Sequence, residues 1–135
     1  MTPSLPKPRP RRAAAETDLV KQLLVELSAR GWLVWRNNSG ALYATIPAGK
    51  LGVRPVYFRG RLVKFGQEGT PDVIGFCRSC GAFLGIEAKS KRGTRRAMQK
   101  VFAAQAELAG VVYACVKTVD QAERAVAAHR CRSLR

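Results

Sequence analysis

The clearest pattern in the first third of the chain is a helical one. Between residues 16 and 30 apolar side chains recur at the spacing of one helix face, namely Leu19, Val20, Leu23, Leu24 and Leu27. Gly31 follows, and glycine commonly ends a helix. The pattern therefore predicts a first helix from Glu16 to Arg30.

A strand and a region without clear periodicity come next. Residues 32–36 are rich in aromatic and β-branched side chains and predict a strand, which the polar residues 37–40 end in a turn. Residues 41–70 carry scattered glycines and prolines. The one pairing that their pattern indicates is a short hairpin of residues 56–58 with residues 61–63.

The next two apolar runs predict a hairpin. Residues 72–76 and 82–88 have the length of strands, and the connection 77–81 has the length and composition of a tight turn. We therefore expect these two strands to pair antiparallel to each other, with the turn near Ser79.

The remaining pattern is helix, strand, helix. Thr94 can cap a helix over residues 95–109, and Gly110 can end it. Residues 111–116 predict a buried strand, and Thr118 opens an alanine-rich helix that reaches about residue 129.

The order of these elements predicts the fold class. Strands 82–88 and 111–116 are joined through a helix, so we expect them to be parallel, with a right-handed crossover. The whole order is helix, three strands, helix, strand, helix. It predicts an α/β domain with a mixed β-sheet flanked by helices.

The net charge of the chain indicates a class of partner. The chain has 24 lysines and arginines against nine aspartates and glutamates, a net charge of +15. Such an excess favours a polyanion, nucleic acid above all, although a solvated basic surface without chemistry is the alternative.

At 135 residues the chain fits one domain. We place it at residues 14–129, between a basic, proline-rich arm of residues 1–13, expected to be disordered, and a basic tail of residues 130–135.

The compartment follows from what the sequence lacks. No apolar run approaches the about 18 residues that span a bilayer, and the amino terminus has no apolar stretch of the signal-peptide kind. We therefore expect a protein with no membrane association, in the cytoplasm of a bacterium or of a phage-infected host.

Three residues of the predicted hairpin carry candidate chemistry. Glu87 and Lys89 alternate along a strand and so project from one face, and Asp72 lies almost opposite Glu87 if the hairpin turns near Ser79. Two carboxylates with an ammonium group can hold a hard cation such as Mg²⁺, which takes oxygen ligands and substrate phosphate. The plainer interpretation is a salt bridge between Glu87 and Lys89 beside a turn aspartate.

The surrounding residues resemble a known nuclease family. Residues 69–75, Gly-Thr-Pro-Asp-Val-Ile-Gly, followed after the hairpin turn by residues 83–89, Phe-Leu-Gly-Ile-Glu-Ala-Lys, resemble the PD-(D/E)XK superfamily and within it the stand-alone phage and bacterial VRR-NUC nucleases. The resemblance extends over residues 16–127 and departs mainly in the cysteine-bearing turn and the basic ends. It implies a restriction-endonuclease-like core.

The resemblance also implies roles for individual residues. Asp72 and Glu87 would ligate Mg²⁺ or Mn²⁺, and Lys89 would assist the attacking water. Glu16 could reach the metal directly or through water, or else simply complement the dipole of the first helix. Gln99 would border the site, whereas an exposed polar residue is its plainer interpretation.

The implied activity is a Mg²⁺-dependent DNA endonuclease. Family members imply branched or junction DNA as substrate and a homodimer with paired sites. Two other classes remain open, a non-catalytic nucleic-acid-binding module and a zinc-stabilised basic adaptor. Candidate contacts to the DNA backbone are the polar and basic residues before and after the triad, namely Arg36, Asn37, Asn38, Arg59, Arg61, Lys64, Lys91, Arg92, Arg95 and Arg96.

The cysteines raise a separate possibility. Cys77 and Cys80 have the two-residue spacing of a zinc half-site, and the predicted topology returns the last helix, with His129 and Cys131 after it, towards the hairpin turn. The four residues could form a structural zinc site remote from the catalytic centre. Unligated thiols at a convenient turn are the favoured alternative, because His-x-Cys is a weak signal.

Overall fold

The computed structural model describes residues 11–131, so most of the expected basic arm and the end of the expected tail lie outside the described residues. The chain divides into two compact units. Residues 38–68 form one, and residues 11–37 together with residues 69–131 form the other. No helix within residues 11–131 has both the length and the apolar character needed to cross a membrane.

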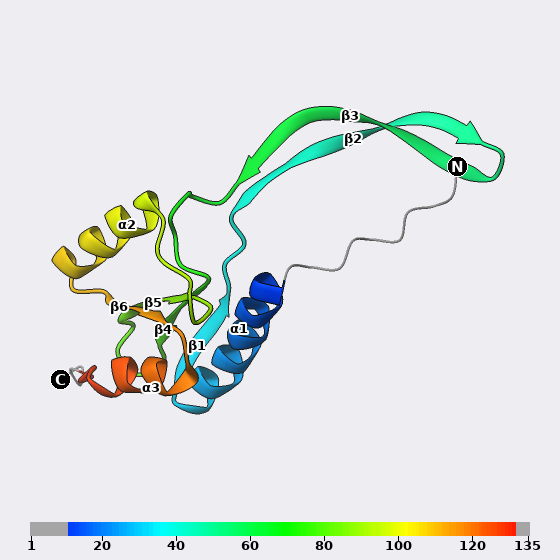
Figure 1. The fold of residues 1–135 in the computed structure, drawn as a ribbon. Coiled ribbons are helices and arrows are strands. Elements are labelled where there is room, and N and C mark those ends of the chain that lie inside the picture. Colours follow the sequence, from blue (N-terminus) through cyan, green and yellow to red (C-terminus); the bar gives the residue numbers. More distant parts are fainter. Residues whose placement is uncertain (1–10, 132–135) are drawn as a thin grey trace. The chain divides into compact units, whose positions relative to one another are not determined.

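The larger unit is a four-stranded mixed sheet with three helices (Figure 1). In chain order its elements are α1 (Arg11–Ala29), β1 (Trp32–Arg36), β4 (Val73–Cys77), β5 (Phe83–Ala88), α2 (Ala97–Leu108), β6 (Val112–Val116) and α3 (Val119–Ala127). The strands lie in the order β1-β4-β5-β6. The pairs β1–β4 and β4–β5 are antiparallel, and β5–β6 is parallel. The predicted α/β class, the hairpin and the parallel pair are confirmed.

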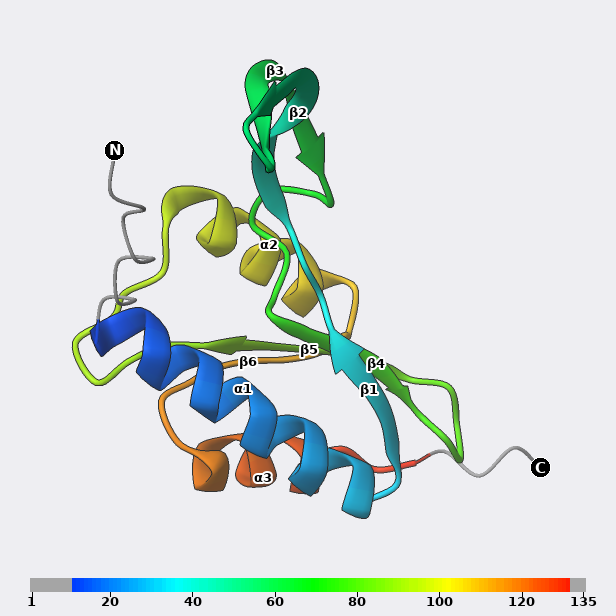
Figure 2. The same cartoon turned by 90° about the vertical axis from the view of Figure 1, so that its right-hand side faces the viewer.

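Helices cover both faces of this sheet. Helix α2 lies on one face, and α1 and α3 lie on the other (Figure 2). The fully buried core includes Leu23 and Leu27 of α1 with Leu84, Ile86 and Val116 of the central strands. Strand β5 is buried along almost its whole length, which explains its nearly uninterrupted apolar sequence.

Gly75 is required where β1 and β4 approach, because a Cβ there would lie 2.0 Å from the Leu33 carbonyl oxygen.

Several predicted helix boundaries shift. Helix α1 begins at Arg11 and so takes in the end of the expected arm. Thr94 does not cap α2, whose N-cap is Arg96; the side chain of Gln99 turns back to accept a hydrogen bond from the Arg96 N–H. Thr118 does cap α3, since its hydroxyl accepts a hydrogen bond from the Gln121 N–H at 3.3 Å.

The smaller unit corrects the predicted short hairpin. It is one long antiparallel hairpin of β2 (Gly40–Leu51) and β3 (Arg54–Phe65), so residues 56–58 and 61–63 lie in the same strand. The turn falls instead at Gly52, whose φ of +64° suits the first central position of a two-residue hairpin turn. Almost every residue of β2 is exposed. A ribbon without a buried face leaves no alternation for the sequence to display.

Candidate active site and a Cys/His cluster

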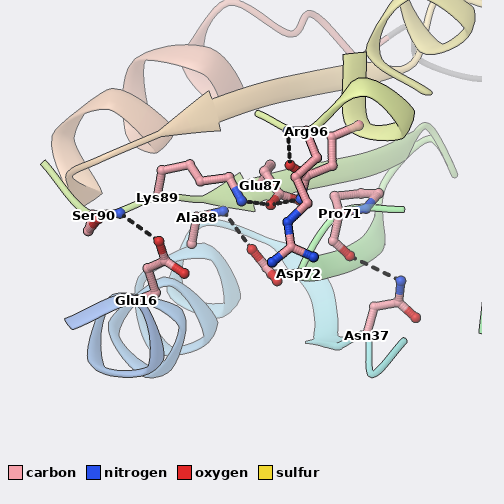
Figure 3. Close-up of polar contacts among 10 residues, drawn as sticks. Glu16, Asn37, Pro71, Asp72, Glu87, Ala88, Lys89, Ser90 and Arg96 are labelled. Carbon is pink, nitrogen blue, oxygen red and sulfur yellow. Dashed lines mark hydrogen bonds and ion pairs between the residues drawn. The ribbon is translucent and has the colours of Figure 1, made fainter. Parts of the chain in front are cut away.

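Asp72, Glu87 and Lys89 meet at one end of the β4–β5 hairpin (Figure 3). Val73 pairs with Ile86, so Asp72 and Glu87 occupy the next position on each side. The Ala88 N–H donates to Asp72 Oδ2 at 2.9 Å, and Lys89 Nζ lies 2.7 Å from Glu87 Oε1. The backbone of Lys89 is fastened in turn to β6, because its N–H donates to the Val116 carbonyl at 2.8 Å. The hairpin register thus brings the three charged groups together, as the alternation predicted.

This end of the sheet buries charge. Glu87 is 1% exposed and Lys89 is 9% exposed, and they are the buried charged residues among those the structure describes. Glu87 Oε1 accepts from both Lys89 and Gln99, whereas Glu87 Oε2 is buried without a hydrogen-bond partner in the described part of the chain. A buried carboxylate oxygen without a partner is costly and requires an explanation.

The electrostatics of the two carboxyl groups follow from this burial. Burial raises the pKa of Glu87 to about 7, and the neighbouring Asp72 charge adds to the rise against the opposing effect of Lys89. Burial likewise raises the pKa of Asp72, although the hydrogen bond from Ala88 and the charge of Lys89 oppose it. Two neighbouring carboxyl groups with raised pKa values are costly to ionise together. A bound cation would lower that cost, because its charge stabilises both carboxylates.

Gln99 and Glu16 both border the carboxylates. Gln99 Nε2 of α2 donates to Glu87 Oε1, while its own Oε1 accepts from the Arg96 N–H at 2.8 Å. Glu16 of α1 accepts from the Ser90 N–H at 3.1 Å, and its charge contributes to the raised pKa of Asp72. Elements on both faces of the sheet therefore supply a polar group beside the hairpin end (Figure 3).

Asn37 holds the segment that precedes Asp72. Its side-chain amide donates to Thr70 Oγ1 at 2.8 Å and to the Pro71 carbonyl at 3.0 Å, and its N–H donates to the Asp72 carbonyl at 2.7 Å. Sequence reasoning singled out Asn37 for the DNA backbone. The structure engages its amide within the protein, where it positions the metal-ligand candidate Asp72.

Tyr113 is a neighbour of the site that sequence reasoning missed. Tyr113 lies on β6 and pairs with Gly85 of β5. Its hydroxyl is buried, and burial and the Glu87 charge both raise its pKa. A single tyrosine in an apolar strand gives no indication that it lies beside the candidate site. Only the parallel register of β5 and β6 reveals it.

The predicted DNA contacts divide between the two units. Arg36 ends β1, and Lys91, Arg92, Arg95 and Arg96 follow the triad within the larger unit. Asn38, Arg59, Arg61 and Lys64 belong to the smaller unit, where the Arg59 guanidinium stacks 3.4 Å from the centre of the Tyr43 ring. The structure therefore groups one set of basic residues after Lys89 and a second set on the β2–β3 hairpin.

At the opposite end of the β4–β5 hairpin, four potential metal ligands converge. The Cys/His cluster consists of Cys77 at the end of β4, Cys80 in the turn, and His129 and Cys131 after α3. All four ligand atoms lie within 4.8 Å of one another. Cys77 Sγ is 3.3 Å from Cys131 Sγ, and Cys80 Sγ is 3.2 Å from His129 Nε2. These residues could hold a metal ion, as the topology predicted.

Comparison with known proteins assigns no family. No protein-family model matches the chain, and no curated protein is significantly similar to it.

Proposed function

We propose that this protein is a Mg²⁺- or Mn²⁺-dependent endonuclease that hydrolyses phosphodiester bonds in DNA, with Asp72, Glu87 and Lys89 at its centre. The observation that carries the proposal is the facing pair of Asp72 and Glu87 carboxyl groups, in which the buried Glu87 Oε2 accepts no hydrogen bond from an N–H or hydroxyl group of the described residues. A structural salt bridge would explain Glu87 Oε1, which Lys89 contacts, but it leaves Oε2 unexplained.

The residues present fit a hard divalent cation. Asp72 and Glu87 offer carboxylate oxygens from facing strand positions, and Mg²⁺ is commonly bound by one or two carboxylates together with substrate phosphate. Glu16 is a further carboxylate close enough to influence Asp72. When bound, the cation would supply Lewis-acid stabilisation of the phosphate and a more acidic water.

The chain's own side chains have distinct tasks in this proposal. Lys89 is held beside Glu87, where its ammonium group can orient the attacking water or neutralise a phosphate oxygen. Gln99 steadies the Glu87 carboxylate from α2. The net charge of +15 attracts the polyanionic substrate to a site that would otherwise repel it with its carboxylates.

The resemblance to VRR-NUC nucleases supports the same activity and extends it. It favours a restriction-endonuclease-like core, branched or junction DNA as substrate, and a homodimer with paired sites. We include these features in the proposal.

The test is cleavage of linear, flapped and four-way DNA and of closed circular DNA, with and without Mg²⁺. We expect Mg²⁺-dependent products, nicking of the closed circle because the enzyme needs no free end, and preference for branched forms. Asp72→Asn and Glu87→Gln should each lower the rate by about 10²–10⁴-fold, since each removes a ligand charge needed in the transition state.

The matched control is Glu107→Gln, which neutralises an exposed carboxylate on α2. It should cleave at the wild-type rate. Binding of DNA without cleavage under Mg²⁺ or Mn²⁺ would instead identify a non-catalytic binding module, and wild-type cleavage by purified Asp72→Asn would rule out this site.

A further inference from the structure

The Cys/His cluster takes no part in the proposed cleavage chemistry. We propose that it binds one Zn²⁺ ion in a structural site that fastens the segment after α3 to the β4–β5 turn. The proposed zinc site uses none of the residues assigned to cleavage and does not require the nuclease activity.

The spacing of the four ligand atoms fits one tetrahedral ion. Zn–S bonds of about 2.3 Å place two sulfurs on a tetrahedron about 3.8 Å apart, and a sulfur and a nitrogen slightly closer. The observed separations are 3.3 Å between Cys77 Sγ and Cys131 Sγ, and 3.2 and 3.8 Å from His129 Nε2 to the sulfurs of Cys80 and Cys131. Since all four ligand atoms lie within 4.8 Å of one another, small movements of the side chains would accommodate the ion at the centre.

The chemistry of the ligands selects zinc. Three thiolates and an imidazole are soft or borderline ligands that suit Zn²⁺ and not Mg²⁺. Four protein ligands leave no open coordination position, which is the mark of a structural site and not of a catalytic one. The same chain would thus bind two metals of different character at separate places.

Local structure holds each ligand in place. The Cys77 carbonyl accepts from the Gly81 N–H at 2.8 Å, so the turn brings Cys80 back beside Cys77. The His129 N–H donates to the Val126 carbonyl at 3.1 Å, and the buried Trp32 ring packs against the imidazole with ring centres 5.3 Å apart. Such packing orients a ligand ring before the metal arrives.

Charge at the site is also balanced. Zn²⁺ with three thiolates carries one net negative charge. Arg78 lies between Cys77 and Cys80, and Arg130 lies between His129 and Cys131; both are exposed. These two guanidinium groups can offset the negative charge at the surface without burying it.

The site is distinct from the carboxylate end of the hairpin. Asp72 and Cys77 are five strand positions apart along β4, which corresponds to about 16 Å. An ion at the Cys/His cluster therefore cannot touch the reacting phosphate. It would act by closing a loop between the turn and a segment about 50 residues later in the chain, which stabilises the fold.

Metal analysis of the full-length protein, purified under reducing conditions without added zinc, tests the proposal. We expect about one equivalent of zinc per chain in wild type and less than about a tenth of an equivalent in Cys77→Ser and in His129→Ala. Cys115→Ser is the matched control, because Cys115 is a free cysteine outside the cluster, and it should keep its zinc.

A ligand exchange keeps the test decisive if the first variants fold poorly. His129→Cys retains four ligands and should bind zinc, and replacement by Co²⁺ should give the visible absorption of a tetrahedral thiolate site in wild type and His129→Cys. Less than about a tenth of an equivalent of zinc in folded wild type, iron in its place, or an oxidised Cys77–Cys131 pair found by mass would each overturn the proposal. Because these measurements do not involve DNA, they fail or succeed independently of the nuclease.

Discussion

The two ends of the β4–β5 hairpin differ in almost every physical respect. One end gathers carboxylates and an ammonium group that are almost entirely buried at Glu87 and Lys89; the other gathers three sulfurs and an imidazole near the surface, with Cys131 exposed. At the first end the hairpin register alone brings Asp72 and Glu87 together. At the second end, the cluster exists only if the segment after α3 returns to the turn.

This contrast indicates what a metal ion would contribute at each end of the hairpin. Strand pairing already holds Asp72 and Glu87, so losing a cation there should cost chemistry and leave the fold intact. Within residues 11–131 no strand pairing joins Cys77 to Cys131, whose link is a contact between their two sulfurs, so losing an ion there should cost stability and leave the chemistry intact.

The largest expected effect is at Lys89. Lys89→Met should lower the rate of DNA cleavage by about 10²–10⁴-fold, because it removes the ammonium group that acts on water or phosphate. Zinc content, measured on the same sample, should stay at the wild-type level. The matched control is Lys100→Met, which removes an exposed lysine from α2 and should change neither quantity.

Two results would contradict this prediction. Cleavage at the wild-type rate by Lys89→Met would remove Lys89 from the mechanism. A loss of zinc together with cleavage would show that the two ends of the hairpin are coupled and are not independent sites.

The sequence alone was sufficient to predict that the charged side chains meet at one end of the hairpin, because that prediction needs only local information. Asp72, Glu87 and Lys89 lie on two short strands with a tight turn, and alternation within a strand determines which side chains share a face. The Cys/His cluster needed the parallel pairing of β5 with β6 and the return of α3, which element order alone suggested. The convergence of its ligand atoms within 4.8 Å could come only from the structure.

Other features left no usable pattern. Gln99 was placed at the site only through the family resemblance, because no apolar periodicity reports that its side chain reaches Glu87. The β2–β3 hairpin was predicted too short and with its turn in the wrong place, because exposed strands show no alternation and Gly49 and Pro47 within β2 suggested a loop.

The next prediction concerns pH and the divalent cation. Glu87 has its pKa raised from 4.5 to about 7, and the pKa of Asp72 is raised as well. Without a cation, the folded protein keeps a proton on Glu87 that the unfolded chain releases, so the contribution of Glu87 to stability falls as pH rises from 4.5 to about 7 and is constant above it; the raised pKa of Asp72 acts in the same direction. A cation must displace the same protons.

Mn²⁺ should therefore raise the melting temperature little at about pH 5.5 and much more at about pH 8. A hundredfold excess over Kd corresponds to about 2.7 kcal/mol at the higher pH. Calorimetry of the zinc-loaded protein measures the melting temperature, and the zinc content is checked at each pH. The double variant Asp72→Asn with Glu87→Gln should show no shift at either pH; a shift equal to that of wild type would place the Mn²⁺ site elsewhere.

The smallest expected effect is at Gln99, which we treat as a positioning residue. Its amide donates a hydrogen bond to Glu87 Oε1, and such a bond favours the ionised carboxylate. Gln99→Ala should therefore raise the pKa of Glu87 further and move the acidic limb of the pH–rate profile upward by about one unit, with about a tenfold loss of rate at neutral pH. Gln105→Ala, an exposed glutamine on the same helix, is the matched control and should leave the profile unchanged. A uniform loss of rate across all pH values would show that Gln99 acts on the placement of α2 and not on the ionisation of Glu87. That outcome would confine the tuning of this carboxylate to Lys89, Asp72 and the burial imposed by the sheet.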